Sequence, residues 1–384
     1  MIKKDYLILG LVILFFVSCS SDKINPFDLE EVANSGLGEV QHITKVGTVQ
    51  EQTVDFPVSY VKTGDDLLIG KYREIESAIL LKFGTVTDDL SNVEVKKAFL
   101  FLYPKSKIKG ETSTPISVEG HNVTMNWTEE SIEPLDVLSN YDVNVVAAGQ
   151  YPDSLIVQDS LEIGTEFVQS WIDNNVDNNG LLLTAPDADH IAVYSSEDAS
   201  EFPVLKIIYE EQSQTDSSLF AATEATSVIQ NSFQIPADRL VVGSGAGMVS
   251  YFKVDYEEVP RKATINRAFL TLHVDTLNSL HQDIIYEFSQ LKARSSDWLN
   301  SPEFADSSSY DTTRYLGGET LRINLQNSIQ DWVNRNIDDY GFRFAPLSMG
   351  NGLFRTVVYS STIADSLLKP KLEIYYSLPP EYSR

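Results

Sequence analysis

The sequence predicts an all-β protein made of two tandem jelly-roll β-sandwich domains, each with one short α-helix. Three observations support this: short apolar runs of strand length, turn clusters of Gly, Asn, Asp and Pro between them, and one repeat of the whole pattern. The chain has 384 residues, which favours two or three domains. Its apolar fraction of 42% is enough to form cores, so wholesale disorder is excluded.

The internal repeat sets the domain organisation. An apolar run at residues 95–103 recurs at 265–273, and both copies contain Ala-Phe-Leu. Four further landmarks then recur in the same order. They are a tryptophan followed by an Asn- and Asp-rich stretch that ends in Gly, an apolar run that ends in Ala-Pro, the motif Val-Tyr-Ser-Ser, and the motif Pro-x-Leu-x-Ile-x-Tyr. We therefore predict domains at 41–211 and 220–379, a polar linker at 212–219 and a tail at 380–384.

Most segments read as strands, and one segment of each copy reads as a helix. Residues 98–103 form a near-continuous apolar run, which is typical of a strand in a sandwich core. Helical periodicity is carried by Phe167 and Trp171 in the first copy and by Ile329 and Val333 in the second. A glycine follows each helix, as expected beyond a helix end. We expect Trp171 and Trp332 to lie in the cores.

The N-terminal residues 1–18 are predicted to be a lipoprotein signal peptide. Lys3 and Lys4 supply positive charge, and the apolar run at 6–17 is shorter than the roughly 20 residues that span a bilayer. Ser18 then precedes Cys19, the only cysteine of the chain, and the junction resembles a bacterial lipobox. An ordinary signal peptide with an incidental cysteine, or an uncleaved anchor, is the alternative.

Lipidation at Cys19 predicts an extracytoplasmic protein that is held on a membrane by a lipid on the first residue of the mature chain. Two or three acyl chains anchor firmly where a single chain is marginal. Residues 19–40 are polar with Asn-Pro and Gly breaks, so we expect a flexible tether. The expected location is the outer membrane, either surface-exposed or facing the periplasm.

The repeated landmarks resemble the DNRLRE domain family, which are jelly-roll β-sandwiches of secreted bacterial proteins. The resemblance rests on a strand containing Lys82 or Lys253, then Ala-Phe-Leu-x-Leu, a tryptophan loop, the helix, Tyr-Ser-Ser and the final Pro-x-Leu-x-Ile-x-Tyr strand. Some relatives are carbohydrate-binding modules, including modules that bind alginate. The resemblance therefore implies polysaccharide binding, with outer-membrane glycan-uptake proteins as candidate partners.

The charge of the chain excludes several classes of partner. The formal net charge is −26, which argues against nucleic acid, whose binding depends on Lys and Arg contacts with phosphates. It argues equally against electrostatic binding to an anionic membrane surface. A polyanionic glycan would also be repelled without calcium or a local basic patch, so neutral glycans are favoured.

No motif identifies a resident metal, and calcium stays an open cofactor. Residues 173–179 alternate Asp and Asn as a calcium loop does, but its sixth position is not Gly and its twelfth is Thr184 rather than Glu. We interpret this stretch as a helix-exit loop. Asp187, Asp189 and His190 could clasp a cation, but an ordinary loop is the favoured interpretation. No nucleophile, acid–base or paired-carboxylate constellation stands out, so we do not predict an enzyme, with a polysaccharide lyase or hydrolase as the remote alternative.

Loop aromatic residues are the candidate glycan-binding positions. Sugar rings present C–H faces that stack on aromatic rings, and a rigid β scaffold with aromatic loops suits this task. For the two tryptophans, a plug under their own sandwich is the favoured interpretation. The candidates are Trp127, Tyr141, Tyr151, Trp298, Tyr310 and Tyr315. The favoured function is a non-catalytic, lipid-anchored protein that binds polysaccharide, and the alternative is a structural or assembly lipoprotein that contacts envelope or protein partners.

Overall fold

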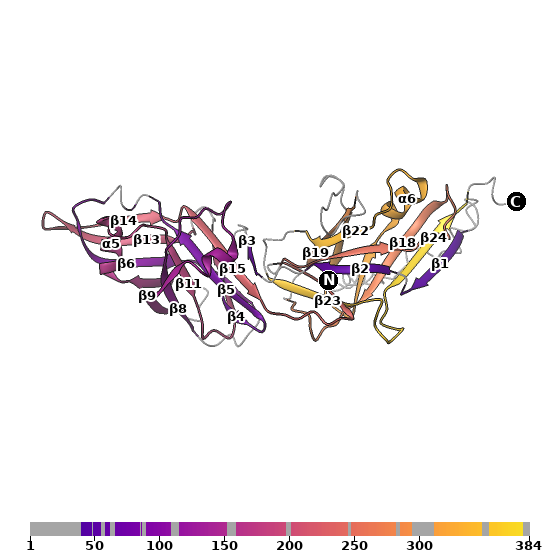
Figure 1. Cartoon of the computed structure of the whole chain (residues 1–384), viewed down its shortest axis with the longest axis horizontal. Helices are drawn as coiled ribbons and strands as arrows, with labels where there is room; N and C mark the ends of the chain where they lie inside the picture. The colour runs from indigo at the N-terminus through magenta and orange to yellow at the C-terminus, as the bar shows by residue number, and fades with distance from the viewer. Residues whose placement is uncertain are drawn as a thin grey trace, which may run out of the picture.

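The protein is an all-β sandwich protein in its computed structural model (Figure 1). The structure describes residues 40–47, 49–54, 58–61, 66–84, 86, 90–108, 115–151, 159–196, 201–244, 247–281, 285–293, 311–347 and 353–378. Every strand pair with a described register is antiparallel. The predicted fold class is confirmed, and the strands form two bodies that lie along the long axis of the molecule.

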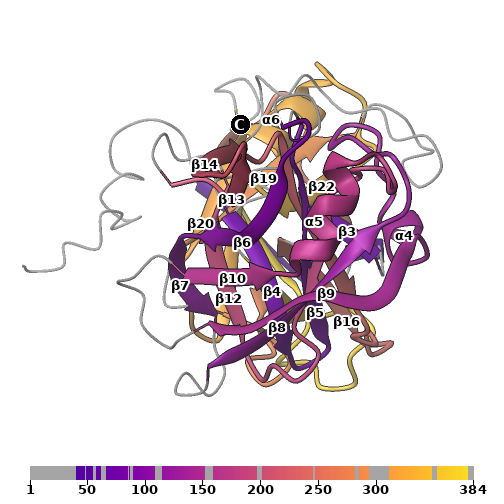
Figure 2. The same ribbon diagram turned by 90° about the vertical axis from the view of Figure 1, so that its left-hand side faces the viewer.

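The N-terminal body consists of one curled sheet of 13 strands around a main core, with a second, smaller cluster on the other face of the sheet. The strand order is β14-β13-β6-β10-β9-β8-β11-β5-β4-β12-β7, with β15 paired to β5 and β3 paired to β15. Helix α5 lies beside the sheet, and Figure 2 shows it in front of the strands. The elements are β3 (Val58–Val61), β4 (Asp66–Tyr72), β5 (Ile75–Lys82), β6 (Glu94–Leu102), β7 (Pro104–Ile108), β8 (Ile116–Val123), α4 (Pro134–Val137), β9 (Tyr141–Tyr151), β10 (Asp159–Ile163), α5 (Thr165–Ile172), β11 (Leu181–Thr184), β12 (Ile191–Ser195), β13 (Val204–Glu211), β14 (Gln214–Ala221) and β15 (Glu224–Asn231).

The C-terminal body has two main sheets, β1-β24-β18-β21 and β2-β17-β22-β19-β20, and a separate pair, β16-β23. Its core combines aliphatic residues of the first sheet with a group of phenylalanines of the second, including Phe252, Phe288, Phe342 and Phe344. The elements are β1 (Val40–Val46), β2 (Val49–Val54), β16 (Arg239–Ser244), β17 (Val249–Val254), β18 (Thr264–His273), β19 (Tyr286–Lys292), β20 (Asp311–Tyr315), β21 (Thr320–Asn324), α6 (Gln326–Asn334), β22 (Phe342–Pro346), β23 (Phe354–Tyr359) and β24 (Lys371–Ser377).

The two bodies are nested in the sequence, which corrects the expected tandem boundaries at 41–211 and 220–379. Strands β1 and β2 pair with β24 and β17 of the C-terminal body, although they begin the chain. The N-terminal body is therefore inserted between β2 and β16. The chain crosses from one body to the other twice, after β2 and after β15.

The segment expected to be a linker, 212–219, contributes to a sheet instead. Strand β14 forms a hairpin with β13, in which Glu211 pairs with Gln214. The two turn residues, Gln212 and Ser213, both have positive φ, as a type I′ turn requires. Strand β14 is an edge strand and is mostly exposed, so its polar composition is compatible with strand structure.

Two pairs of consecutive strands play the same role in the two bodies. Strand β14 pairs with β13 and β15 pairs with β5 in the N-terminal body. Strand β1 pairs with β24 and β2 pairs with β17 in the C-terminal body. Since β13 and β24, and likewise β5 and β17, are repeat equivalents, each body is completed by the first two strands of the other repeat.

The predicted helices are confirmed as α5 and α6. In α5, Val168, Trp171 and Ile172 are buried, and in α6 the buried face includes Trp332. Both tryptophans lie in the cores, as expected. Within the described residues, neither these helices nor α4 is long and apolar enough to cross a membrane.

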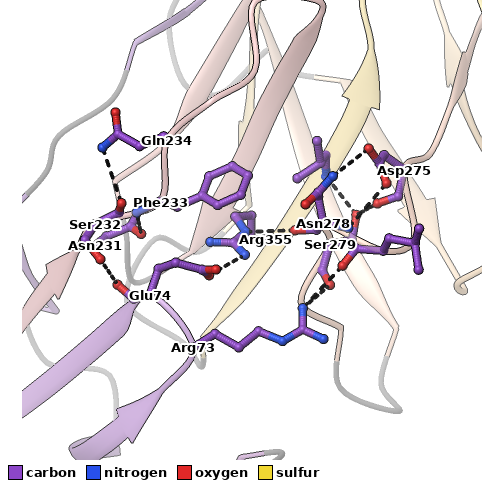
Figure 3. A network of polar contacts seen from close by, with 12 residues as sticks. Arg73, Glu74, Asn231, Ser232, Phe233, Gln234, Asp275, Asn278, Ser279 and Arg355 are labelled. Carbon is purple, nitrogen blue, oxygen red and sulfur yellow. Dashed lines mark hydrogen bonds and ion pairs between the residues drawn. The ribbon is translucent and has the colours of Figure 1, made fainter.

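A polar network centred on the buried Arg355 joins the two bodies (Figure 3). Arg355 on β23 is 1% exposed, and its Nη2 lies 3.0 Å from Oε2 of Glu74 in the N-terminal body. The Arg355 guanidinium also lies 3.6 Å from the ring centroid of Phe233. Arg73 of the N-terminal body donates to the carbonyl oxygen of Ser279 at 3.3 Å. Burial lowers the pKa of Arg355 and Glu74 opposes this, so the ion pair retains the charge of a guanidinium removed from water.

Apolar packing surrounds this network. One buried cluster contains four residues of β4, β5 and β12, one residue of β15, and two residues of the C-terminal body. Because the cluster takes side chains from both sides of the junction, the bodies share a small core in addition to the two chain crossings. Its members are Leu68, Ile75, Ile191, Val193, Ile229, Leu280 and Leu353.

Candidate functional site

The first predicted glycan-binding residue, Trp127, is a core plug. Its side chain is 2% exposed and packs with Leu80, Val123 and Leu182 on one face of the curled sheet. Its Nε1 donates to the carbonyl oxygen of Asn179 at 2.8 Å. The ring therefore offers no open face to a sugar, and of the two interpretations of this residue the structure supports the plug.

The tyrosine candidates are not brought together. Tyr315 is 3% exposed, its hydroxyl donates to the carbonyl oxygen of Gly318 at 2.6 Å, and burial raises its pKa. Tyr141 is half-buried in the N-terminal body, with its ring edge against His121. Tyr315 therefore offers no exposed ring, and Tyr141 stands in the other body. The backbone of Tyr151 ends β9, and its side chain, like Trp298, Tyr310 and Cys19, lies outside the described residues.

The two metal motifs considered in the sequence do not assemble a cation site where they are described. His190 is 1% exposed, and its Nδ1 lies 2.8 Å from Oδ1 of the neighbouring Asp189. In the helix-exit loop, Asp173 accepts from Gln169 at 3.0 Å. No group of three or more His, Cys, Asp or Glu side chains placed to hold a metal occurs among the residues that the structure covers.

The feature that sequence reasoning missed is the outer face of strands β14, β13, β6 and β10. On β6, Ala98, Leu100 and Leu102 are fully buried, whereas Phe99 and Phe101 between them are half-buried and belong to no core cluster. Their ring centroids are 6.5 Å apart. The run at 98–103, which the sequence predicted to be a sandwich-core strand, contributes one face to the core, and Phe99 and Phe101 point away from it.

Cross-strand pairing assembles these phenylalanines into a strip. Residues opposite each other on antiparallel strands share a face. Val204 of β13 pairs with Phe101, and Lys206 pairs with both Phe99 and Leu219 of β14. We define the outer strip as Phe99, Phe101, Val204, Ile208 and Leu219.

Hydrogen-bonding side chains border the outer strip. Glu162 and Ser160 of β10 pair with Phe99 and Phe101. Lys97 pairs with Ile208 on the same face, and Lys206 lies between Phe99 and Leu219. The border thus carries donors and acceptors and charges of both signs. Leu219 is 67% exposed, so the strip reaches solvent at the sheet edge.

The C-terminal body has the same face with different chemistry. The equivalent of Phe99 is Phe269, which pairs with Glu373 of β24 and Asn324 of β21. Arg322 places its guanidinium carbon 4.0 Å from the Phe269 ring centroid, and Arg267 places its own at 4.8 Å. Thr271 stands at the position of Phe101.

The edge of this second face is also occupied by the chain itself. His42 of β1 stacks on Tyr375 of β24, with ring centroids 4.2 Å apart and an interplanar angle of 8°. Opposite Phe269 on β24 stands Glu373, and its β1 partner is Thr44. In the N-terminal body the corresponding residues are Lys206 and Leu219. The two faces therefore differ in apolar character although their strand registers correspond.

Comparisons with known proteins add no relative: no family model, curated protein or solved structure matches the chain. The resemblance to the DNRLRE domain family therefore rests on the sequence motifs. The functional argument below depends on the geometry of the described residues.

Proposed function

We propose that this chain is a non-catalytic, lipid-anchored, extracytoplasmic protein that binds polysaccharide. The observation that carries the proposal is the outer strip, in which two outward-facing phenylalanines are bordered by hydrogen-bonding side chains on one sheet face. A rigid sheet face holds these rings in place without an ordering cost on binding.

The chemistry of the outer strip matches that of a sugar chain. The face of an aromatic ring carries partial negative charge, which attracts the polarised C–H groups of a pyranose ring. Sugar hydroxyls both donate and accept hydrogen bonds, as does the hydroxyl of Ser160, whereas the border residues Lys97 and Lys206 donate and Glu162 accepts. With border charges of both signs and a chain net charge of −26, a neutral glycan is the favoured class.

The fold supports presentation of this face away from a membrane. The first described residue, Val40, pairs with Ser377 near the end of β24. Figure 1 shows β1 at the end of the molecule opposite β6 and β14. A lipid at Cys19 would therefore hold the C-terminal body nearer the membrane and leave the outer strip at the far end, accessible to extracellular glycan and to outer-membrane glycan-uptake partners.

A glycan array tests the proposal directly. The soluble chain beginning after Cys19 is applied to the array with and without calcium. We expect binding to neutral polysaccharides that persists in the presence of a calcium chelator. Binding to no glycan under either condition would contradict the proposed function.

A second candidate, a structural or assembly lipoprotein, is favoured by the way the two bodies are joined. Two chain crossings and the ion pair between the buried Arg355 and the partly exposed Glu74 connect the bodies, as a scaffold requires. Affinity purification from envelope extracts tests this candidate. Recovery of one stoichiometric envelope protein, together with an empty glycan array, would favour it over polysaccharide binding.

A further inference from the structure

We infer that only the N-terminal body binds the glycan and that the C-terminal body closes its equivalent face with its own arginines. This inference rests on the proposed function and specifies the site at which it operates. It names Phe99 and Phe101 as the stacking residues, Leu219 as the edge contact, and Arg322 and Arg267 as the residues that cover the second face.

Register makes the two faces directly comparable. Phe99 pairs with Lys206 on one side and Glu162 on the other, and Phe269 pairs with Glu373 and Asn324 in the same way. Two residues further along β6, Phe101 pairs with Ser160. The corresponding pair in the C-terminal body is Thr271 and Arg322. Ser160 and Arg322 are therefore equivalent, and the second body has an arginine where the first has a short hydroxyl side chain.

Arginine at this position occupies the surface that a sugar would need. A guanidinium within about 6 Å of a ring centroid is attracted by the ring quadrupole. Arg322 at 4.0 Å and Arg267 at 4.8 Å both meet this criterion on Phe269. In the part of the chain that the structure describes, no cation is placed over Phe99 or Phe101. A sugar stacking on Phe269 would have to displace two cations, whereas the outer strip needs no such rearrangement.

The outer strip is too small for a protein partner and suits a narrow chain. A standard protein–protein interface uses roughly 20–30 residues on each side, with a continuous apolar centre. The outer strip has five apolar side chains, and Lys206 interrupts it between Phe99 and Leu219. An alternation of apolar and hydrogen-bonding groups across successive strands matches a ligand that is itself apolar on its ring faces and polar at its rim.

One consequence concerns valency. If both bodies bound one glycan chain, avidity would arise within a single molecule. With the second face closed, each molecule has one site at its distal end, and avidity comes from many tethered copies along one polysaccharide. The tandem repeat then serves as a binding body mounted on a structural body.

The test compares matched variants of the soluble full-length chain by affinity gel electrophoresis. The probes are mixed-linkage β-glucan, xylan and galactomannan, together with any glycan that the array identifies. We expect Phe99→Ala/Phe101→Ala to weaken retardation about tenfold, because two stacked rings are lost. The matched control Phe269→Ala changes retardation less than about twofold. Leu219→Asp provides a second variant at a 67% exposed position, where folding is not at stake, and we expect weaker binding from it too.

A transplant sharpens the test in the opposite direction. Arg322→Ser with Thr271→Phe gives the C-terminal face the residues that the N-terminal body has at those positions. We expect binding stoichiometry by calorimetry to rise from about one site to about two per chain.

Failure of this inference and failure of the proposed function are distinguishable. Equal losses from the Phe269 and Phe99/Phe101 variants, or normal binding by the Phe99/Phe101 and Leu219 variants, would overturn the inference and leave glycan binding in place. A wild-type chain that binds nothing on the array or in the gels would overturn both.

Discussion

The N-terminal and C-terminal bodies share a repeat but differ on the surfaces that the repeat leaves free. Both keep Ala, Leu and Leu of the central strand pointing inward, as Ala98, Leu100 and Leu102 do in β6. The outward positions diverge, from Phe101 in one body to Thr271 in the other. Core positions are constrained by packing, so the outer face is where two copies of one fold acquire separate roles.

The bodies also differ in how the chain completes them. The N-terminal body is continuous from β3 to β15, whereas the C-terminal body takes β1 and β2 from the far end of the sequence. A continuous body can fold as soon as its own residues are available. The C-terminal body depends on β1 and β2, which precede the whole N-terminal body in the sequence. The two bodies should therefore respond differently to the same kind of damage.

Removal of residues 20–54 should produce the largest difference in stability between the two bodies. The deletion uncovers the edges of β24 and β17 and removes Ile43, which packs against the C-terminal core. We expect the C-terminal body to lose its cooperative thermal transition while the N-terminal body keeps its own, measured by calorimetry and limited proteolysis. The point variant Ile43→Asp serves as a milder control. Equal loss of both transitions would show that the bodies fold as one unit.

Trp127→Ala should be the most damaging single substitution tested in the N-terminal body. Truncation of a buried tryptophan costs about 3–5 kcal/mol in free energy of unfolding, and here the hydrogen bond to Asn179 is lost as well. Denaturant unfolding monitors the loss. Glycan retardation under native conditions should stay unchanged, because Trp127 packs over β5, β8, β11 and β15 and not over the strands that carry the outer strip. Weaker glycan binding without loss of stability would return Trp127 to the list of binding residues.

Sequence reasoning recovered the parts of this fold that local pattern determines. The repeat, the two helices and the core tryptophans follow from apolar spacing, and all are present. The nested order of strands could not be read from the sequence, because β1 and β14 could pair with the last strand of either repeat. The same limit made residues 212–219 look like a linker, since an exposed edge strand is as polar as a loop.

The candidate site was harder to predict than the fold, for a physical reason. An apolar run of strand length is typical of a strand in a sandwich core, so nothing within the run at 98–103 marked Phe99 and Phe101 as outward-facing. A usable signal was the contrast between copies: Phe-Leu-Phe in one repeat and Phe-Leu-Thr in the other, at residues 99–101 and 269–271. Alternating positions that differ between copies mark the face that packing does not constrain.

Glu74→Gln tests how firmly the bodies are joined. The substitution removes the carboxylate that pairs with Arg355, whose side chain is 2% exposed. A buried charge left without its partner destabilises, and since Glu74 is 41% exposed we expect about 1–2 kcal/mol. We expect calorimetry to show separate thermal unfolding transitions for the two bodies. Glu76→Gln, which breaks an ion pair with Lys71 inside the N-terminal body, is the control, and an unchanged single transition in Glu74→Gln would contradict the role given to the pair.

Asp339→Asn should have the smallest effect on stability. It gives the C-terminal body the residue type that the N-terminal body has at the equivalent position. Asp339 follows α6 at the position that Asn178 occupies after α5. Burial raises the pKa of Asp339, against hydrogen bonds from Gly341 and Tyr256 that lower it. A carboxyl whose pKa is raised by folding favours the folded state fully below its unfolded pKa, and this contribution is lost as pH rises through the folded pKa.

The free energy of unfolding of the wild-type C-terminal body should therefore fall slightly as the pH rises from the ordinary titration range of aspartate upward. The asparagine variant should lack this component, with a change below about 1 kcal/mol, the size of a single hydrogen bond. Urea unfolding of both proteins at several pH values measures it, and Asn178→Asp supplies the reciprocal change in the N-terminal body. Because Asn178 donates from Nδ2 to the carbonyl oxygen of Phe83 at 2.6 Å, a carboxylate there loses a donor and should be the more costly exchange. Identical pH profiles for wild type and Asp339→Asn would show that the carboxyl is more solvated than its burial indicates.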